Sequence, residues 1–198
     1  MLVACKDREE IDKLKVLLNS EFKMKDLGYA RKILGMEIKM NRSKWIMFLS
    51  QEKYLRKELE TFDMSKAKPV QLLLASHFRL SNLQCPQTEA EKQDMTSVPY
   101  ANAVGCLMYA MVLTRPNITH AVSVVSRYMA QPEEDHWKAV KWILRYLNGT
   151  INWGLMYGKT KASDEVLKGY VDSDYAGDLD RRRSLTGYLF MLNGYAVN

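Results

Sequence analysis

The chain has 198 residues, of which 47% are hydrophobic and 26% are charged, as in ordinary folded domains. No apolar run reaches the roughly 20 residues that cross a bilayer, and the N-terminal apolar run is too short for a secretion signal. We therefore expect a protein without membrane contact that is intracellular, cytoplasmic or nuclear, and not secreted. The three cysteines and three histidines lack the spacing of zinc ligands.

The net charge of +6 lies mostly in the first third of the chain. Residues 1–68 hold 16 Lys or Arg and 11 Asp or Glu, whereas residues 149–198 hold six of each. A basic excess favours a polyanionic partner, because binding to phosphates releases condensed counterions. Many soluble proteins carry the same charge merely for solubility, so this second interpretation stays open.

The N-terminal residues predict a strand followed by a helix. Residues 2–5 have the composition of the tail of a buried strand. Asp7 is a suitable cap for a helix, and Glu10 can complete a capping-box pair. Apolar residues then recur at helical spacing, which predicts that one face of the helix packs against the core. This stripe consists of Ile11, Leu14, Leu18 and Phe22.

A β-hairpin and a second helix are expected next. Residues 33–40 and 45–49 are rich in strand-forming side chains, and residues 41–44 between them favour a turn. The helix after the hairpin is marked by Leu55, Leu59 and Phe62. Residues 65–99, by contrast, contain three prolines and a long polar run, which indicates a connecting segment with little regular structure.

Three helices are predicted between residues 100 and 149. Residues 100–113 are nearly all small or apolar, so they suit a buried helix, and Pro116 can open the next helix. Pro132 opens the third helix, in which acidic residues come first and Arg145 lies near the end, as the helix dipole favours. The expected buried face of the second helix consists of Ile118, Ala121, Val122, Val125 and Met129.

The third helix carries two distinct faces. Its apolar face consists of Trp137, Val140, Ile143, Leu144 and Leu147. We expect Trp137 to be buried against the second helix. Lys138, Lys141 and Arg145 share another face, which is either a solvated charged surface or a stripe that follows a phosphate backbone.

Two strands joined by a loop are predicted at the C-terminus, after a polar linker at residues 158–166. The first strand should end near Asp172, and the second should cover residues 186–192. Alternation along a strand places Asp172 and Asp174 on the same face, if the strand extends that far. Carboxylates suit Mg²⁺, but aspartates beside a turn are also common turn formers, so both interpretations stay open.

Short motifs occur along the whole chain in a characteristic order. They include ILGMEI at residues 33–38, Thr114-Arg115-Pro116, Ser126-Arg127, His136-Trp137, Gly149-Thr150 and GYVDSDYAGDLDRRRSLTGY. Each motif is short, and the specificity comes from their number and order. In this combination the chain resembles the Pol polyprotein of copia-type long-terminal-repeat retrotransposons over essentially its whole length.

The resemblance implies an α+β fold with a helical, thumb/connection-like centre. β-Hairpins from an incomplete reverse transcriptase palm and an incomplete RNase H-like domain would flank this centre. Residues 1–64 would be the end of the palm, with a primer-grip-like hairpin and the helix that follows it. Residues 65–157 would be the thumb/connection-like segment, and residues 165–198 would be the first strands of a truncated RNase H-like domain.

The resemblance also implies a function for the parent polyprotein. It would perform RNA-directed DNA synthesis and RNase H cleavage of RNA–DNA hybrids, with Mg²⁺ as the cofactor. Asp172 would be the first catalytic, metal-binding carboxylate of the RNase H-like site. The residues that would contact nucleic acid are Gly35, Met36, Lys138, Lys141 and Arg145.

The same resemblance predicts that this chain lacks both complete active sites. The Tyr-x-Asp-Asp turn of the polymerase would precede Met1, and the remaining RNase H carboxylates would follow Asn198. We therefore expect neither activity and no tightly bound Mg²⁺ in the isolated chain. At most it would contact template–primer or an RNA–DNA hybrid, together with the rest of Pol. The alternative is a non-catalytic nucleic-acid-binding remnant or a pseudogene product.

Overall fold

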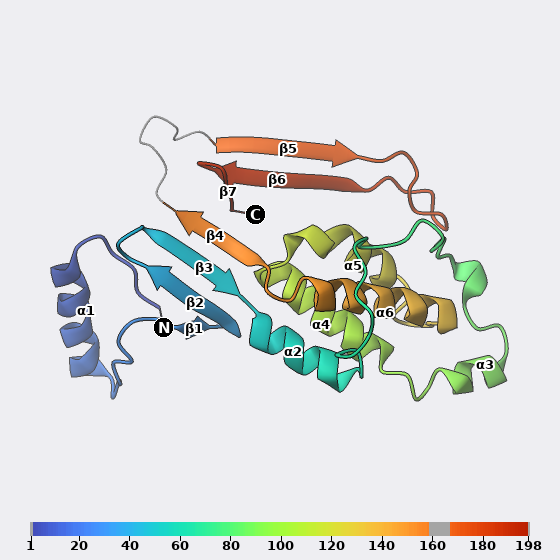
Figure 1. Ribbon diagram of the computed structural model, residues 1–198, viewed down its shortest axis with the longest axis horizontal. Helices are drawn as coiled ribbons and strands as arrows, with labels where there is room; N and C mark the ends of the chain where they lie inside the picture. The colour runs from blue at the N-terminus through green and yellow to red at the C-terminus, as the bar shows by residue number, and fades with distance from the viewer. Residues whose placement is uncertain (1, 159–166, 198) are drawn as a thin grey trace.

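A computed structural model describes residues 2–158 and 167–197 of the chain. The described residues form six α-helices, two short 3-10 helices and two antiparallel sheets, which confirms the mixed α+β class (Figure 1). The helices are α1 (Arg8–Glu21), α2 (Glu52–Thr61), η1 (Asn82–Gln84), α3 (Glu89–Asp94), α4 (Tyr100–Leu113), η2 (Pro116–Ile118), α5 (Thr119–Ser126) and α6 (Glu134–Gly149). The strands are β1 (Lys32–Ile33), β2 (Met36–Asn41), β3 (Ile46–Ser50), β4 (Gly154–Gly158), β5 (Leu167–Ser173), β6 (Thr186–Leu192) and β7 (Tyr195–Ala196).

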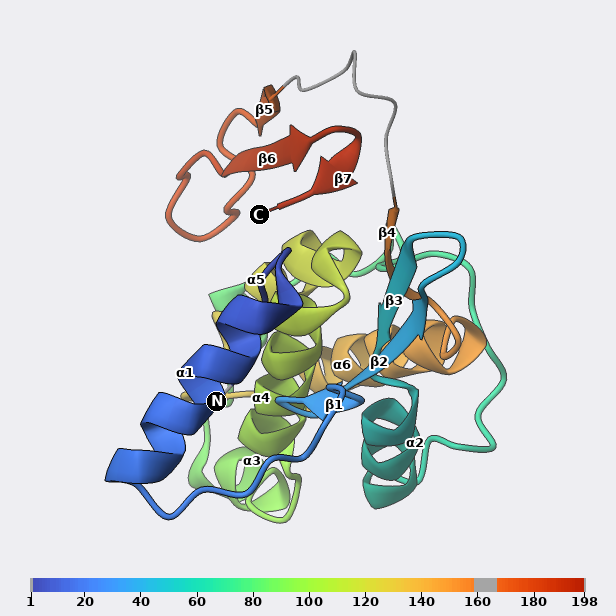
Figure 2. The same cartoon turned by 90° about the vertical axis from the view of Figure 1, so that its left-hand side faces the viewer.

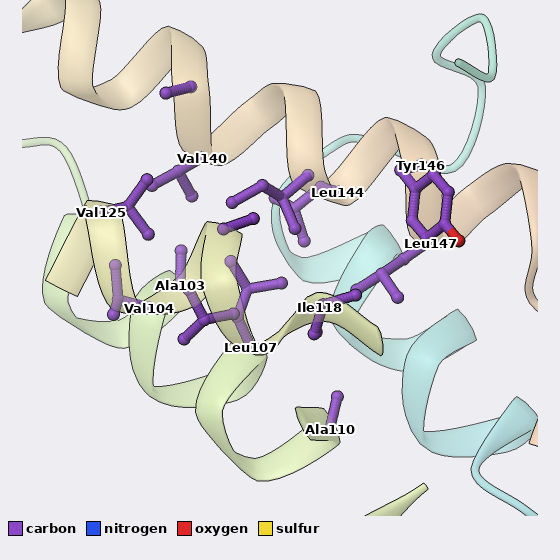
Figure 3. Packing of buried hydrophobic residues seen from close by; sticks show 14 of the residues in the cluster. Ala103, Val104, Leu107, Ala110, Ile118, Val125, Val140, Leu144, Tyr146 and Leu147 are labelled. Atoms are coloured by element: carbon purple, nitrogen blue, oxygen red, sulfur yellow. The ribbon is translucent and has the colours of Figure 1, made fainter. Parts of the chain in front are cut away.

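The hydrophobic core lies among helices α2, α4, α5 and α6. Figure 3 shows Val104 and Leu107 of α4 facing Val140 and Leu144 of α6. Small residues such as Ala103, which is fully buried, let the helices approach closely at this contact. Burial of each large aliphatic side chain contributes about 1.5–3 kcal/mol. The three helices predicted between residues 100 and 149 are therefore present, and their packing forms the centre of the molecule.

Trp137 occupies a different place from the predicted one. Its ring lies edge-on to Phe62, with centroids 6.5 Å apart, and 6.4 Å from the ring of Tyr100. It thus packs where α2 ends and α4 begins, and the prediction that it lies against α5 was wrong. Its neighbour His136 is the residue that contacts the end of α5. His136 is fully buried, and its ring stacks on the ring of Tyr128, just after α5, with centroids 4.1 Å apart. One residue turns a helix by about 100°, so neighbouring side chains face different partners.

Strands β1 to β4 form the first sheet, in that order. The predicted hairpin is confirmed, with its turn one residue later than expected, at residues 42–45, because Asn41 still pairs with Ile46 across β2 and β3. The single strand expected at residues 33–40 is wrong, because a tight turn after Ile33 divides it into β1 and β2. Strand β4 was not predicted; it pairs with β3 after the chain has passed through all of the core helices. A Cβ at Gly154 would lie 2.1 Å from the Leu49 carbonyl oxygen, so glycine permits this pairing.

The N-terminal segment departs most from the prediction. Residues 2–5 form no strand, and helix α1 has no fully buried side chain. Its predicted core stripe is largely open, with Phe22 62% exposed. Figures 1 and 2 show the reason, because α1 lies outside the helical centre and beyond the first sheet. The helix does start as predicted, with the Asp7 carboxylate accepting the Glu9 N–H at 2.9 Å.

Residues 65–99 are mostly irregular, as predicted, although they include η1 and the unexpected short helix α3. The first part of this segment runs along α6. The Trp142 indole N–H donates to the Leu72 carbonyl at 2.9 Å, and the Asn148 amide donates to the Ala67 carbonyl at 3.0 Å. Side chains of α6 thus donate hydrogen bonds to backbone carbonyl groups of this irregular segment, which are not paired within a helix or a sheet.

The second sheet consists of β5, β6 and β7. Strand β6 covers the predicted residues 186–192, and the short strand β7 adds to it. The predicted linker lies outside the described residues except for Gly158, which ends β4. Figures 1 and 2 both place this sheet above α4 and α5, and the Tyr157 hydroxyl donates to the Ala196 carbonyl at 3.1 Å. None of the helices described here is long and apolar enough to cross a membrane.

Candidate nucleic-acid interface

The tip of the β1–β2 hairpin is exposed and firmly anchored. Its two turn residues, Leu34 and Gly35, both have positive φ angles, +46° and +72°. Such a two-residue turn suits the twist of paired strands, and glycine adopts this conformation without strain. The Tyr109 hydroxyl of α4 donates to the Leu34 carbonyl at 2.8 Å, and Tyr54 packs edge-on against Tyr109. Leu34 itself is 66% exposed, and Met36 directly after the turn is half-buried.

The segment that includes this hairpin has an unusual charge. Residues 23–44 hold seven Lys or Arg and two Asp or Glu, a net charge of +5. Both acids are paired with lysines from outside the segment, since Lys15 lies 2.9 Å from Asp26 and Lys53 lies 3.1 Å from Glu37. The basic side chains of the hairpin therefore keep their charge largely uncompensated.

The three basic residues of α6 each have a partner within the chain. Lys138 forms exposed ion pairs with Asp135 and Glu134, at 3.0 and 3.3 Å. The Lys141 ammonium lies 5.8 Å from the centre of the Trp137 ring. Arg145 donates to the Lys68 carbonyl at 2.7 Å and lies over the Trp142 ring. Each of these three side chains therefore has a contact within the chain, and their binding to phosphates stays a prediction.

Asp172 lies next to the last residue of β5, opposite Gly187 of β6, and it is exposed. Tyr170 and Val171, which point to opposite faces of the strand, are also exposed. Asp174 has a different surrounding, because one of its carboxylate oxygens accepts the Leu185 N–H at 2.5 Å. Asp174 thus holds the loop between β5 and β6 closed, a role that the sequence pattern left open.

A Mg²⁺ site needs several oxygen ligands. Within residues 2–158 and 167–197, no three His, Cys, Asp or Glu side chains are grouped so that they could hold a metal ion. Asp172 is therefore not part of such a group in the described part of the chain. These residues alone do not fit a Mg²⁺ site.

Comparison with known proteins identifies the family. The family model described as "Reverse transcriptase (RNA-dependent DNA polymerase)" matches residues 1–76. Across all 198 residues the chain is 54% identical to the retrovirus-related Pol polyprotein from transposon TNT 1-94 of Nicotiana tabacum. It is also 35% identical, over 175 residues, to an uncharacterized mitochondrial protein of Arabidopsis thaliana, and covers 68% of that protein. The chain belongs to the Pol family of copia-type retrotransposons.

This Pol segment corresponds to 15% of the length of the tobacco polyprotein. A further relative is the secreted RxLR effector protein 161 of Plasmopara viticola, which is 49% identical over 104 residues. The match covers 52% of this chain and 72% of that protein. No solved structure matches the chain.

The Thr-Arg-Pro motif of this Pol segment has a structural role that the sequence reasoning missed. Arg115 is 1% exposed, and its guanidinium donates to the Thr150 carbonyl at 2.8 Å and to the Thr150 hydroxyl. Thr114 donates to the buried Gln51 amide oxygen at 2.6 Å. The motif therefore ties η2 to the end of α6 and to the start of α2. The sequence feature that could have indicated this role is the position of a polar Thr-Arg pair between two apolar helices.

His136 forms a second buried polar contact in this Pol segment. Its Nδ1 accepts the Glu133 N–H at 3.0 Å and so caps the start of α6. Burial lowers the pKa of His136, because a charged imidazolium would lose its hydration there. The folded protein therefore holds this histidine in its neutral form over a wider pH range than the unfolded chain does.

We expect the free energy of unfolding to decrease as the pH falls below about 6.5, the ordinary imidazole pKa. In that range the unfolded chain binds a proton that folded His136 does not, so acid favours unfolding. His136→Gln keeps an acceptor for the Glu133 N–H and removes the titration. Urea melts near neutral pH and about two units lower should show a larger fall in midpoint for the wild type. Equal falls for both proteins would contradict the assignment.

Proposed function

We propose that this Pol segment contacts the nucleic acid that its parent polyprotein copies. The β1–β2 hairpin would act as a primer-grip-like element and present Gly35 and Met36 to a template–primer or an RNA–DNA hybrid. The observation that carries the proposal is the net charge of +5 over residues 23–44. The two acids of this segment, Asp26 and Glu37, form ion pairs with lysines from outside it. An uncompensated basic hairpin with an anchored, exposed tip suits a phosphate backbone.

The parent polyprotein, in this proposal, carries out RNA-directed DNA synthesis and RNase H cleavage with Mg²⁺. The sequence of this chain contains no Tyr-x-Asp-Asp motif, so the segment would supply contacts to the substrate and one carboxylate, Asp172, but no complete active site. Its partners would be the nucleic acid and the rest of Pol. It would act inside the cell, in the cytoplasm or nucleus, where the RNA template is found.

Binding to a fluorescently labelled RNA–DNA hybrid tests the proposal. We expect weak, sequence-independent binding near the typical range of about 10⁻⁴ to 10⁻⁶ M at physiological salt, which tightens as the salt falls. Replacing Lys32 and Lys39 by glutamine should weaken binding several-fold. It should also make the dependence of log K on log salt shallower by about 0.9 for each lost phosphate contact.

The matched control for this experiment replaces Lys66 and Lys92, two exposed lysines outside the hairpin, and changes the net charge equally. It should reduce affinity less than the hairpin variant does. No anisotropy change for the wild type even at low salt would refute the proposal and favour a pseudogene product. Equal losses for both variants would show that overall charge, and not the hairpin, determines binding.

A further inference from the structure

The loop between β5 and β6 separates its charges in space. Residues 174–185 hold three Asp and three Arg, so the basic turn at Arg181-Arg182-Arg183 is balanced by acids and the net charge of the loop is zero. In the structure, however, each aspartate carboxylate accepts hydrogen bonds. The donors to Asp174 and Asp178 lie within the loop, and the donors to Asp180 lie outside it. Asp174 accepts the Leu185 N–H, as described above, which closes the loop at its base.

Asp178 organises the middle of the loop. It is 8% exposed, and its Oδ1 accepts the N–H groups of Asp180 and Arg181, both at 3.0 Å. The Arg127 guanidinium lies 3.7 Å from the same oxygen. The Arg181 N–H, as the largest influence, holds the pKa of the Asp178 carboxyl below its ordinary value, so the group is ionised at neutral pH.

Asp180 attaches the loop to the helical centre. One carboxylate oxygen accepts the Asn82 N–H at 2.8 Å, and the other accepts the Tyr128 hydroxyl at 3.1 Å. Tyr128 is itself held by its stack on the buried His136. Asp178 and Asp180 are thus directed towards the protein, where Asp180 contacts η1 and Tyr128, and Asp178 lies near Arg127.

Arg181, Arg182 and Arg183 are left on the outer side of the loop. All three residues are exposed, and none forms an ion pair or a side-chain hydrogen bond with another residue in the described ranges. Three adjacent guanidinium groups are therefore exposed to solvent on an anchored turn. Guanidinium groups match the geometry of phosphate oxygens better than lysine does, because they offer paired N–H donors.

We propose that Arg181, Arg182 and Arg183 form a phosphate-contacting surface for the RNA–DNA hybrid, held in place by the inward-facing Asp178 and Asp180. This inference rests on the proposed function, which it extends to a second region. The loop directly follows β5, so the arginines lie on the same hairpin that presents Asp172. The nucleic-acid backbone is favoured over an acidic protein because regularly spaced phosphates can engage three consecutive guanidinium groups.

The test compares hybrid binding by the wild type, by the triple variant Arg181→Gln, Arg182→Gln, Arg183→Gln, and by a control of equal charge. The control variant carries Lys13→Gln, Lys66→Gln and Lys92→Gln, all at exposed positions away from the loop. At low salt the triple variant should bind about tenfold or more weakly, and its salt dependence should be shallower by roughly two to three units. The control should lose clearly less affinity, and circular dichroism should show that all proteins remain folded.

A second variant, Asp180→Ala, distinguishes the effect of anchoring the loop from the effect of the protein's net charge. It removes one negative charge, so binding governed by total charge would tighten. Binding that needs the anchored loop should weaken instead, because the Asn82 and Tyr128 contacts are lost. Tighter or unchanged binding by Asp180→Ala would overturn the anchored surface, as would equal losses for the triple variant and its control. Equally effective competition by polyglutamate and by unlabelled hybrid would overturn the nucleic-acid assignment.

Failure of the inference and failure of the proposed function give different results. If the wild type binds no hybrid at low salt, the proposed function fails and the loop has no such ligand. If the wild type binds and the Lys32 and Lys39 variant is weakened, while the arginine variant equals its control, only the loop surface is refuted.

Discussion

Arg115→Ala is expected to lower the free energy of unfolding by about 3–5 kcal/mol. The change leaves a void between η2 and the end of α6, and such cavities in a packed interior cost several kcal/mol. It also removes the donor to the buried Thr150 carbonyl, and an orphaned buried acceptor costs about 1–3 kcal/mol. Relief of the desolvation of the guanidinium offsets part of this loss. Burial lowers the pKa of Arg115, which reflects that desolvation.

Urea unfolding followed by tryptophan fluorescence measures this effect, with two comparison variants. Arg56→Ala removes an exposed arginine in an i,i+4 pair with Glu52 and should change stability by less than roughly 0.5 kcal/mol. Arg115→Met fills much of the void without charge or donors, so it should recover part of the loss. A loss below about 1 kcal/mol for Arg115→Ala would show that the buried network contributes little to the fold.

Asp172→Asn should reduce RNA-strand cleavage by roughly a hundredfold or more in a Pol chain that contains this segment together with the rest of the polyprotein. This expectation rests on the proposal that Asp172 supplies one carboxylate of the parent's RNase H-like site. Asparagine has nearly the same shape but no negative charge, so it is a poor ligand for a hard cation. Binding of the hybrid should change little, because a single exposed charge is altered.

Hydrolysis of a labelled RNA–DNA hybrid provides the measurement, and Asp174→Asn is the matched control. Its amide oxygen can still accept the Leu185 N–H, so the loop should stay closed and cleavage should fall only a few-fold. Full activity of the Asp172→Asn chain, or a greater loss with Asp174→Asn, would show that Asp172 is a turn residue and that the site is wrongly placed.

Elements with strong local patterns were predictable from the sequence. Helix α4 is a continuous run of small and apolar residues, the helix after Pro132 has helical periodicity, and strand β6 was placed at the correct residues. The turn between β1 and β2 was missed because Leu34, which adopts a positive φ, is not a usual turn residue. Strand β4 was missed because its pairing depends on a partner about a hundred residues earlier in the chain.

In the candidate site, too, local motifs were predictable from the sequence and contacts that depend on packing were not. Sequence motifs pointed to Asp172 and to the hairpin residues Gly35 and Met36, because these short patterns are local. The anchoring of the hairpin by Tyr109 could not be predicted, since it needs the packing of α4 against the first sheet. The charge separation in the β5–β6 loop was also invisible, because composition counts charges without recording which way they point.

The pairing of β3 with β4 also bears on where the molecule can be divided. The reverse transcriptase family match ends at residue 76, but the edge of β3 is covered by a strand from residues 154–158. A shorter piece that stopped at residue 76 would leave a row of unpaired N–H and C=O groups on an apolar edge strand, which is a template for aggregation. The sheet that contains β3 therefore extends past the boundary of the family match, and its completion requires closure of a loop of about a hundred residues.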